Sequence, residues 1–284
     1  MKNNSIVILF LIFTSCAPAL HQNISFETLM ASRSFAAKSL ENNADSINCN
    51  LNSEIKKDQF IVKNNLWGKS RLKGARASLC SFYSDKAVGW KWNLPENARG
   101  VIGYPAVQWG QGPWETTQSL HGFPVRLDSL TVLNVQFAAE QYIKHKKYNL
   151  AFDLWLSSAY FSHPKTITTE IMVWEDFYDF RSFGKKIQEI KTPFGDYEFW
   201  SGYIKNEEFG QDWQYFAFIR KEKRNAGTVD LNYFLQFLIQ KKLIDATQYL
   251  TSVELGNEIG NSSGFTRLHN LELHIEKSTN TLNK

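Results

Sequence analysis

The chain has 284 residues, a formal net charge of +4 and an aromatic content of 14%, with nine tryptophans and 21 phenylalanines. This length and composition are enough for one large domain with its own apolar core. The modest charge argues against a nucleic-acid-binding protein, and the short basic cluster at 144–147 is interpreted as a solvated loop tip. So many aromatic residues either fill a β-rich core or provide flat surfaces for ligands such as sugar rings.

Residues 1–15 have the features of an export signal. Lys2 precedes an apolar run that ends at Phe13 and is too short to span a bilayer. The sequence 13–16, Phe-Thr-Ser-Cys, is similar to a bacterial lipobox and predicts that Cys16 is lipidated and anchors the protein at a membrane surface. Cleavage nearby and free secretion is the alternative. We therefore expect a monomeric bacterial protein that is either secreted or held as an outer-membrane lipoprotein.

Residues 17–46 are rich in Asn, Ser and Ala and are interpreted as a spacer, with a short helix around Phe26–Ser39. From about Gln59 onward, short strand-like runs alternate with Gly, Pro and Asn clusters, which predicts an all-β sandwich or jelly roll over 47–276 and a tail over 277–284. The expected strands are 60–62, 89–92, 130–132, 148–156, 169–174, 198–203, 213–220, 249–255 and 268–275.

One helix is expected near Leu231. Thr228 can cap it, Asp230 falls in its first turn, and Lys241 and Lys242 suit its carboxyl end. Leu231, Phe234, Leu235 and Leu238 follow helical spacing. We expect this helix to pack on the convex side of two curved, antiparallel sheets.

Cysteine and histidine residues indicate a disulfide and no metal site. Cys49 and Cys80 remain after Cys16 is set aside, and an even remainder in an exported chain favours one disulfide over two free thiols. Neither cysteine lies near a pair of histidines, and the histidines of the chain do not have the spacing of zinc ligands. We expect neither a metal nor a cofactor.

The run 168–174 predicts a strand with a carboxylate on one face. Side chains alternate along a strand, so Glu170, Met172 and Trp174 share one face while Ile171 and Val173 share the other. A second carboxylate, Glu258, ends another strand-like run. Hydrolysis of a glycosidic bond usually requires two carboxyl groups that face each other across a groove.

Several sequence strings occur in the order seen in family 12 glycoside hydrolases, which the chain resembles from about Cys49 to Ile275. They are Asn-Asn-Leu-Trp-Gly at 64–68, Tyr-Pro-Ala-Val-Gln-Trp-Gly at 104–110, Phe-Asp-Leu-Trp at 152–155, Glu-Ile-Met-Val-Trp at 170–174 and Ser-Val-Glu-Leu-Gly-Asn-Glu at 252–258. The resemblance implies a β-jelly roll and a retaining endo-β-1,4-glucanase acting on β-glucan. A xyloglucan-specific endoglucanase or a xylanase, and a non-catalytic glycan-binding jelly roll, are the alternatives.

The resemblance also assigns roles. Glu170 matches the nucleophile and Glu258 the general acid/base, whose pKa the nearby ionised nucleophile should raise, and Asp153 matches a supporting aspartate. In a retaining enzyme the two catalytic carboxyls lie about 5–5.5 Å apart. Expected substrate-binding residues are Asn65, Trp67, Trp109, Met172 and Trp174, with Trp114 as a further candidate.

The chain departs from the family pattern around the general acid/base. The family usually has Gly-Thr-Glu-Pro-Phe, whereas residues 256–260 read Gly-Asn-Glu-Ile-Gly. Glu254 lies on the same strand face as Glu258 and is a second candidate for the acid. Glu175 and Asp176, which follow the nucleophile strand, are interpreted as a solvated strand end.

Overall fold

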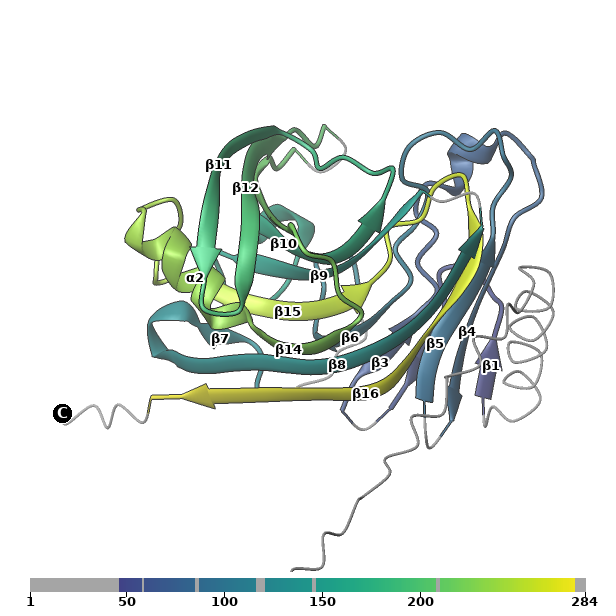
Figure 1. Ribbon diagram of the computed structural model, residues 1–284. Helices are drawn as coiled ribbons and strands as arrows, with labels where there is room; N and C mark the ends of the chain where they lie inside the picture. The colour runs from purple at the N-terminus through teal and green to yellow at the C-terminus, as the bar shows by residue number, and fades with distance from the viewer. Residues whose placement is uncertain are drawn as a thin grey trace, which may run out of the picture.

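The computed structural model describes residues 46–57, 59–84, 87–115, 121–144, 147–207 and 210–278, and it has two stacked β-sheets (Figure 1). The expected export signal, Cys16 and the spacer helix lie outside the described residues. Within the described part, no helix is both long and apolar enough to cross a bilayer.

The smaller sheet has six strands. Their spatial order is β1 (Ser46–Asn48), β4 (Ser78–Ser84), β5 (Ala87–Asn93), β16 (Ser263–Lys277), β8 (Leu130–Lys144) and β14 (Ala226–Asp230). A disulfide joins Cys49, just after β1, to Cys80 in β4.

The larger sheet has ten strands. Their order is β11 (Lys185–Thr192), β12 (Gly195–Ile204), β13 (Trp213–Arg220), β10 (Ile167–Tyr178), β9 (Tyr148–Ser157), β15 (Tyr249–Gly256), β6 (Ala106–Gly110), β3 (Ile61–Lys63) and β2 (Glu54–Lys56), with β7 (Val125–Arg126) pairing β15. In Figure 1 this sheet lies above β8 and β16 and curls upward at β11 and β12. Among the described strands, β10 and β13 run parallel and the other neighbours are antiparallel. The structure confirms the expected jelly roll of two curved sheets.

The main core lies between the two sheets. Ile171 and Val173 of β10 contribute to it together with Phe152 of β9, and all three are fully buried. Met172 and Trp174 belong to a second apolar cluster on the opposite face of the same sheet. The expected alternation along β10 is confirmed, so the two faces of the larger sheet have different roles.

The helix α2 (Leu231–Gln240) packs on the core face of the larger sheet. The ring centroid of Phe234 lies 4.6 Å from that of Phe218 in β13, whereas Tyr215 of the same strand belongs to the cluster on the opposite, concave face. Short 3₁₀ helices occupy Lys69–Leu72, Leu127–Ser129 and Pro164–Thr166.

The expected start of α2 was wrong by two residues. Asp230 is the N-cap, and its side chain accepts a hydrogen bond from the backbone of Tyr233. Thr228 cannot cap the helix because it lies within β14, where it pairs with Gln136 of β8. The strand therefore runs directly into the helix without a loop.

Candidate active site

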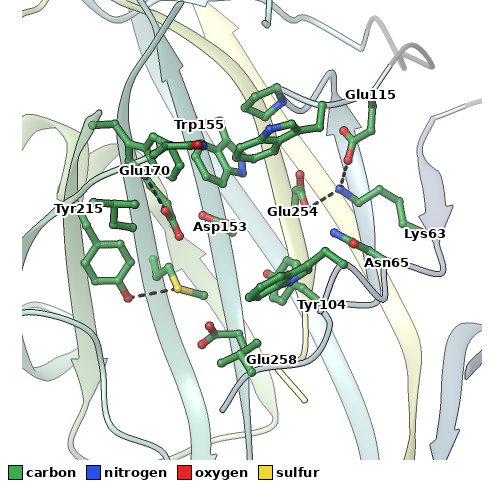
Figure 2. A pocket seen from close by; sticks show the side chains of 18 of the residues that line it. Lys63, Asn65, Tyr104, Glu115, Asp153, Trp155, Glu170, Tyr215, Glu254 and Glu258 are labelled. Atoms are coloured by element: carbon green, nitrogen blue, oxygen red, sulfur yellow. Dashed lines mark hydrogen bonds and ion pairs between the residues drawn. The ribbon is translucent and has the colours of Figure 1, made fainter. Parts of the chain in front are cut away.

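A cavity of about 1370 Å³ opens on the concave face of the larger sheet (Figure 2). Its floor is a row of side chains at paired positions of neighbouring strands. Met172 of β10 lies opposite Asp153 of β9, and Asp153 lies opposite Glu254 of β15. Strand pairing thus places two carboxylates next to each other at the bottom of the cavity.

Glu170 and Glu258 stand on opposite sides of this floor. Glu170 is on β10, opposite Trp155 of β9, and Figure 2 shows both on one wall of the cavity. Glu258 follows β15 and lies with Tyr104 on the other wall. Two carboxylates from different elements therefore face one cavity, as glycoside hydrolysis requires.

Glu170 is fixed by an indole. Nε1 of Trp213, on β13, donates a hydrogen bond of 2.8 Å to Oε2 of Glu170. Burial raises the pKa of Glu170, the hydrogen bond from Trp213 opposes this rise, and Glu258 and Glu254 add to it. The indole thus favours the ionised form of Glu170, which is the form that a nucleophile needs.

Glu258 is held by the amide of Asn149, a fully buried residue of β9. Nδ2 of Asn149 donates a hydrogen bond to Oε2 of Glu258, and the backbone N–H of Glu258 donates back to Oδ1 of Asn149 at 2.8 Å. Burial raises the pKa of Glu258 to about 7, and the hydrogen bond from Asn149 opposes this rise. Burial, rather than the charge of Glu170, is therefore the main cause of the raised pKa that the sequence predicts for the acid.

The two family departures next to Glu258 have structural partners. The side-chain oxygen of Asn257 accepts hydrogen bonds from Nε1 of Trp90 at 2.8 Å and from the hydroxyl of Thr266 at 2.7 Å. Its amide nitrogen donates to the backbone oxygen of Asn149 at 2.6 Å. Ile259 replaces the usual proline, and its backbone N–H donates to the oxygen of Gly103 at 3.0 Å. Asn257 and Ile259 thus fix the backbone on both sides of Glu258.

Glu254 is engaged in a buried ion pair. Nζ of Lys63, on β3, lies 2.8 Å from Glu254 and 2.6 Å from Glu115, and it donates to Oε1 of Gln108 at 2.7 Å. Burial alone would lower the pKa of Lys63, but the two glutamates raise it overall, so the lysine is charged. A carboxylate bound to a charged ammonium is a poor proton donor, which argues against Glu254 as the general acid.

Asp153 lies among these carboxylates. Its pKa is raised by burial and by the negative charges of Glu170, Glu254 and Glu258, and its Oδ1 is buried without a hydrogen-bond partner among the described residues. The protonated form of Asp153 avoids three like charges, and in that form the side chain can donate a hydrogen bond toward a neighbouring carboxylate or a sugar hydroxyl.

Four expected binding residues line the cavity, namely Asn65, Trp67, Met172 and Trp114. Trp67 is 50% exposed, and the guanidinium carbon of Arg71 lies 4.7 Å from the centroid of its ring. One face of the Trp67 ring is thus covered by a cation, and a sugar can use the other.

The prediction of substrate binding was wrong for two residues. Trp109 and Trp174 are each only 1% exposed and do not line the cavity. Trp109 packs into the core between the sheets, against Phe60. Trp174 is on the concave face, as expected, but it lies further along β10 than Glu170 and Met172 and is covered by side chains that include Phe177.

The interpretation of Glu175 and Asp176 as a solvated strand end is also wrong. Glu175 is fully buried, ion-paired with Arg224 and hydrogen-bonded by the hydroxyl of Tyr197 at 2.8 Å. Asp176 accepts a hydrogen bond from the hydroxyl of Tyr148 at 3.0 Å. A register shift between β9 and β10 at Trp174 and Asp176 interrupts the simple alternation on which the interpretation depended.

Sequence reasoning missed Lys63, Tyr104, Asn149 and Trp213 as site residues. Lys63 had a detectable signal, since it directly follows the apolar strand run 60–62, and a lysine that continues a buried strand needs a buried partner. Asn149 and Trp213 had no such signal in the sequence, because their roles arise from contacts between strands that are remote in sequence.

The known proteins and structures that this chain resembles are glycoside hydrolases. The model of the family described as "Glycosyl hydrolase family 12" matches residues 58–283. "Endoglucanase S" of Pectobacterium parmentieri is 26% identical over 262 residues, which cover 89% of this chain and 92% of that protein. A native family 12 xyloglucanase from Bacillus licheniformis is similar in structure, with a TM-score of 0.74, 25% identity and coverage of 81% of this chain and 100% of its own. Endoglucanase cel12A from Rhodothermus marinus has a TM-score of 0.70 at 20% identity, covering 82% of this chain and 100% of its own, and shows the shared fold.

Proposed function

The chain belongs to glycosyl hydrolase family 12 and is an endo-acting glycoside hydrolase, and we propose that it cleaves β-1,4-glucans with Glu170 as nucleophile and Glu258 as general acid/base. The observation that carries the proposal is the position of these two carboxylates on opposite walls of one cavity. Each is fixed by a different neutral donor, Trp213 for Glu170 and Asn149 for Glu258.

The first step transfers the glycosyl group to the enzyme. A carboxylate oxygen of Glu170 attacks the anomeric carbon, the bond from that carbon to the glycosidic oxygen breaks, and Glu258 gives its proton to the departing oxygen. The hydrogen bond from Trp213 aims Glu170 and favours its ionised form against burial, which raises the pKa of Glu170 to about 8. The amide of Asn149 binds Oε2 of Glu258, so that Oε1 is the oxygen left to carry the proton.

The second step releases the product. Glu258, now ionised, takes a proton from a water molecule, the water oxygen attacks the anomeric carbon, and the ester bond to Glu170 breaks. Both steps invert the anomeric carbon, so the product keeps the β configuration. Asp153 supports the reaction from the floor by a hydrogen bond that it can donate while protonated.

The size of the cavity supports a polymeric substrate. A site for one small ligand occupies about 300–1,000 Å³, and this cavity of about 1370 Å³ is larger. Trp67 offers an indole face for a pyranose ring, and Asn65 lies nearby to bind a hydroxyl group. We place several consecutive glucosyl units in the cleft, which is the arrangement that internal cleavage needs.

Xyloglucan is the second candidate substrate. The similar solved structures include the xyloglucanase from Bacillus licheniformis at a TM-score of 0.74, and the cavity of about 1370 Å³ is larger than a site for one small ligand.

We further propose that the enzyme acts outside the cell, anchored through a lipidated Cys16. Mass spectrometry of the mature amino terminus checks this, and an unmodified or absent Cys16 would contradict it.

The experiment compares wild-type enzyme with Glu170→Gln on carboxymethylcellulose, barley β-glucan, xyloglucan and xylan, measured by release of reducing ends. We expect at least about a 10⁴-fold loss of turnover in Glu170→Gln, because a neutral amide cannot form the glycosyl ester. The matched control, Glu272→Gln, changes an exposed residue of β16 and should behave as wild type. Proton NMR of the first product should show the β anomer, and an α anomer would refute the retaining mechanism.

A further inference from the structure

Trp114 is a large apolar side chain that the sequence offers as a candidate binding residue and to which the mechanism above gives no role. It lies on the loop after β6, lines the cavity and is 46% exposed. Its ring is edge-on to that of Trp155, with centroids 5.1 Å apart, and lies 5.9 Å from that of Trp213. Trp155 and Trp213 are nearly buried, so Trp114 is the member of this group that presents a ring surface to the cavity.

The three indoles form one corner of the cavity, here called the tryptophan corner (Trp114, Trp155 and Trp213). The corner is on the same wall as Glu170, because Trp155 is paired with Glu170 and Trp213 donates a hydrogen bond to it. Trp67 also lines the cavity and is two residues after Asn65, whose backbone oxygen accepts a hydrogen bond of 2.8 Å from the N–H of Tyr104 on the Glu258 wall. The tryptophan corner is therefore a second aromatic surface, separate from Trp67.

A buried ion pair fixes the loop that carries Trp114. The next residue, Glu115, accepts a hydrogen bond of 2.6 Å from Nζ of Lys63, which is only 3% exposed. The side chain of Gln111 also donates to the backbone oxygen of Glu115 at 2.7 Å. Breaking a buried ion pair leaves an uncompensated charge, so these contacts hold Trp114 in one place before any ligand binds.

Gly112 shows how tightly this anchor is packed. A Cβ atom added there would lie 2.1 Å from Oε2 of Glu115 and 3.2 Å from Oε1 of Gln108. Both atoms belong to the group of side chains around Lys63. A larger residue at this position must displace the carboxylate of Glu115, so the glycine leaves the room that the anchor occupies.

An exposed indole that is held rigidly in a polar cleft has the properties of a ligand-binding surface. Leaving it in water gives no burial of apolar area, whereas a pyranose ring can stack on it without any rearrangement of the loop. We propose that Trp114, anchored by Glu115 and Lys63, forms a pyranose-binding subsite on the Glu170 wall of the cleft. The proposal deepens the function proposed above and rests on it.

A pyranose ring at this subsite could come from two sources. It could be a glucosyl unit of the main chain, held between Trp67 and Trp114, or a xylosyl branch that leaves the main chain toward the Glu170 wall. Both sources offer the same chemistry, an apolar ring face with hydroxyl groups at its edge. Binding of a linear and a branched oligosaccharide distinguishes them.

The experiment measures oligosaccharide binding by isothermal titration calorimetry in the inactive Glu170→Gln background. The probes are cellohexaose and a xylosylated cellotetraose. We expect Trp114→Ala to weaken binding by about tenfold, the order expected for the loss of one aromatic contact surface. Loss with both probes assigns a main-chain glucosyl unit, and loss confined to the branched probe assigns a xylosyl branch. Unchanged binding of both probes would overturn the proposal.

Matched variants separate binding from packing. Trp114→Phe keeps a flat ring and should recover most of the affinity, whereas Gly112→Ala and Glu115→Gln keep Trp114 but loosen its anchor and should weaken binding by about threefold. Tyr160→Ala removes an aromatic residue that is 66% exposed and lies outside the cavity, and it should have no effect. If Trp114→Ala weakens binding but Trp114→Phe does not restore it, the ring is not a stacking surface and the proposal fails.

This result is independent of the test of the proposed function. Wild-type enzyme that cleaves no β-glucan would refute the function even if Trp114 binds sugar. Wild-type enzyme that cleaves β-glucan, with oligosaccharide binding insensitive to Trp114, would refute only the subsite.

Discussion

Glu254 and Glu258 lie at the same end of the larger sheet, four residues apart in sequence, yet their surroundings differ. Glu254 is 2% exposed and bound to the charged Nζ of Lys63. Glu258 is partly exposed to the cavity and bound by the neutral amide of Asn149. Burial raises the pKa of both carboxyls, so burial does not distinguish them.

The partner decides which of these two glutamates can act as an acid. An ammonium ion stabilises the carboxylate of Glu254 in every step of the reaction. An amide interacts less strongly with the charge, so Glu258 can lose a proton and regain it within one catalytic cycle. The bound cation of Glu254, and not a difference in burial, therefore separates these two glutamates.

The largest expected effect follows from removing each carboxylate in turn. Glu258→Ala should reduce turnover of β-glucan by about 10²–10⁴-fold, the usual contribution of general acid–base catalysis. It should still cleave an aryl glycoside with a good leaving group at an appreciable first-step rate, because that group needs little protonation. Added azide should rescue the variant and yield a β-glycosyl azide, identified by NMR.

Glu254→Ala is the matched control for this experiment. This variant also loses a carboxylate, but the one that is bound to Lys63, so azide should not rescue it. Rescue of Glu254→Ala, with none for Glu258→Ala, would transfer the acid/base role to Glu254 and reverse the comparison.

A smaller effect concerns the pH dependence of kcat/KM. The hydrogen bond from Asn149 opposes the rise in the pKa of Glu258, so Asn149→Ala should raise that pKa above its present value of about 7. The acid is active when protonated, and activity is lost as pH rises through its pKa. The alkaline limb of the profile should therefore move to higher pH, with about a tenfold loss at the optimum because Glu258 is less well aimed.

Trp213→Phe sharpens this test because it acts on the opposite limb. Trp213 opposes the rise in the pKa of Glu170, so its loss should raise that pKa. The nucleophile is active when ionised, and activity is lost as pH falls through its pKa, so the acidic limb should move to higher pH. Since the two carboxyls titrate as a coupled pair, the limbs report macroscopic values. Movement of the same limb in both variants would contradict the separate roles.

The smallest expected effect is on stability. Glu254→Gln removes one of the two carboxylates bound to Lys63 but leaves Glu115 to balance its charge. We expect the free energy of unfolding to fall by about 1–2 kcal/mol, measured by denaturant titration. The matched substitution at an exposed ion pair, Glu189→Gln, should leave the unfolding midpoint unchanged. An equal loss in both variants would show that burial of the Lys63 pair has no special weight.

The sequence predicted the residues whose positions depend on one strand. Alternation along 168–174 placed Glu170 and Met172 on the cavity side and Ile171 and Val173 in the core, as observed. The same alternation failed for Trp174 because it assigns a face but does not show whether other side chains cover that face. Phe177, three residues later, is one of those that cover it.

The contacts that tune the site could not be predicted, because they join strands that are distant in the chain. Lys63 reaches Glu254 only because β3, β6 and β15 are neighbours in the larger sheet. Asn149 reaches Glu258 through the pairing of β9 with β15. The resemblance to a family supplied the identity of the catalytic carboxylates but not the groups that hold them.

The residues beside Glu258 have a consequence for engineering. Returning a chain to the usual residues of its family is a common route to higher stability. Here that route would fail at two positions. Proline in place of Ile259 removes the N–H that donates to the backbone oxygen of Gly103. Asn257 accepts hydrogen bonds from Trp90 and Thr266 through its side-chain oxygen and donates one to Asn149 through its amide nitrogen. Threonine in its place has no amide nitrogen, so it cannot provide both functions. Positions 257 and 259 are best left out of any such library, because each holds hydrogen bonds that the usual family residue cannot make.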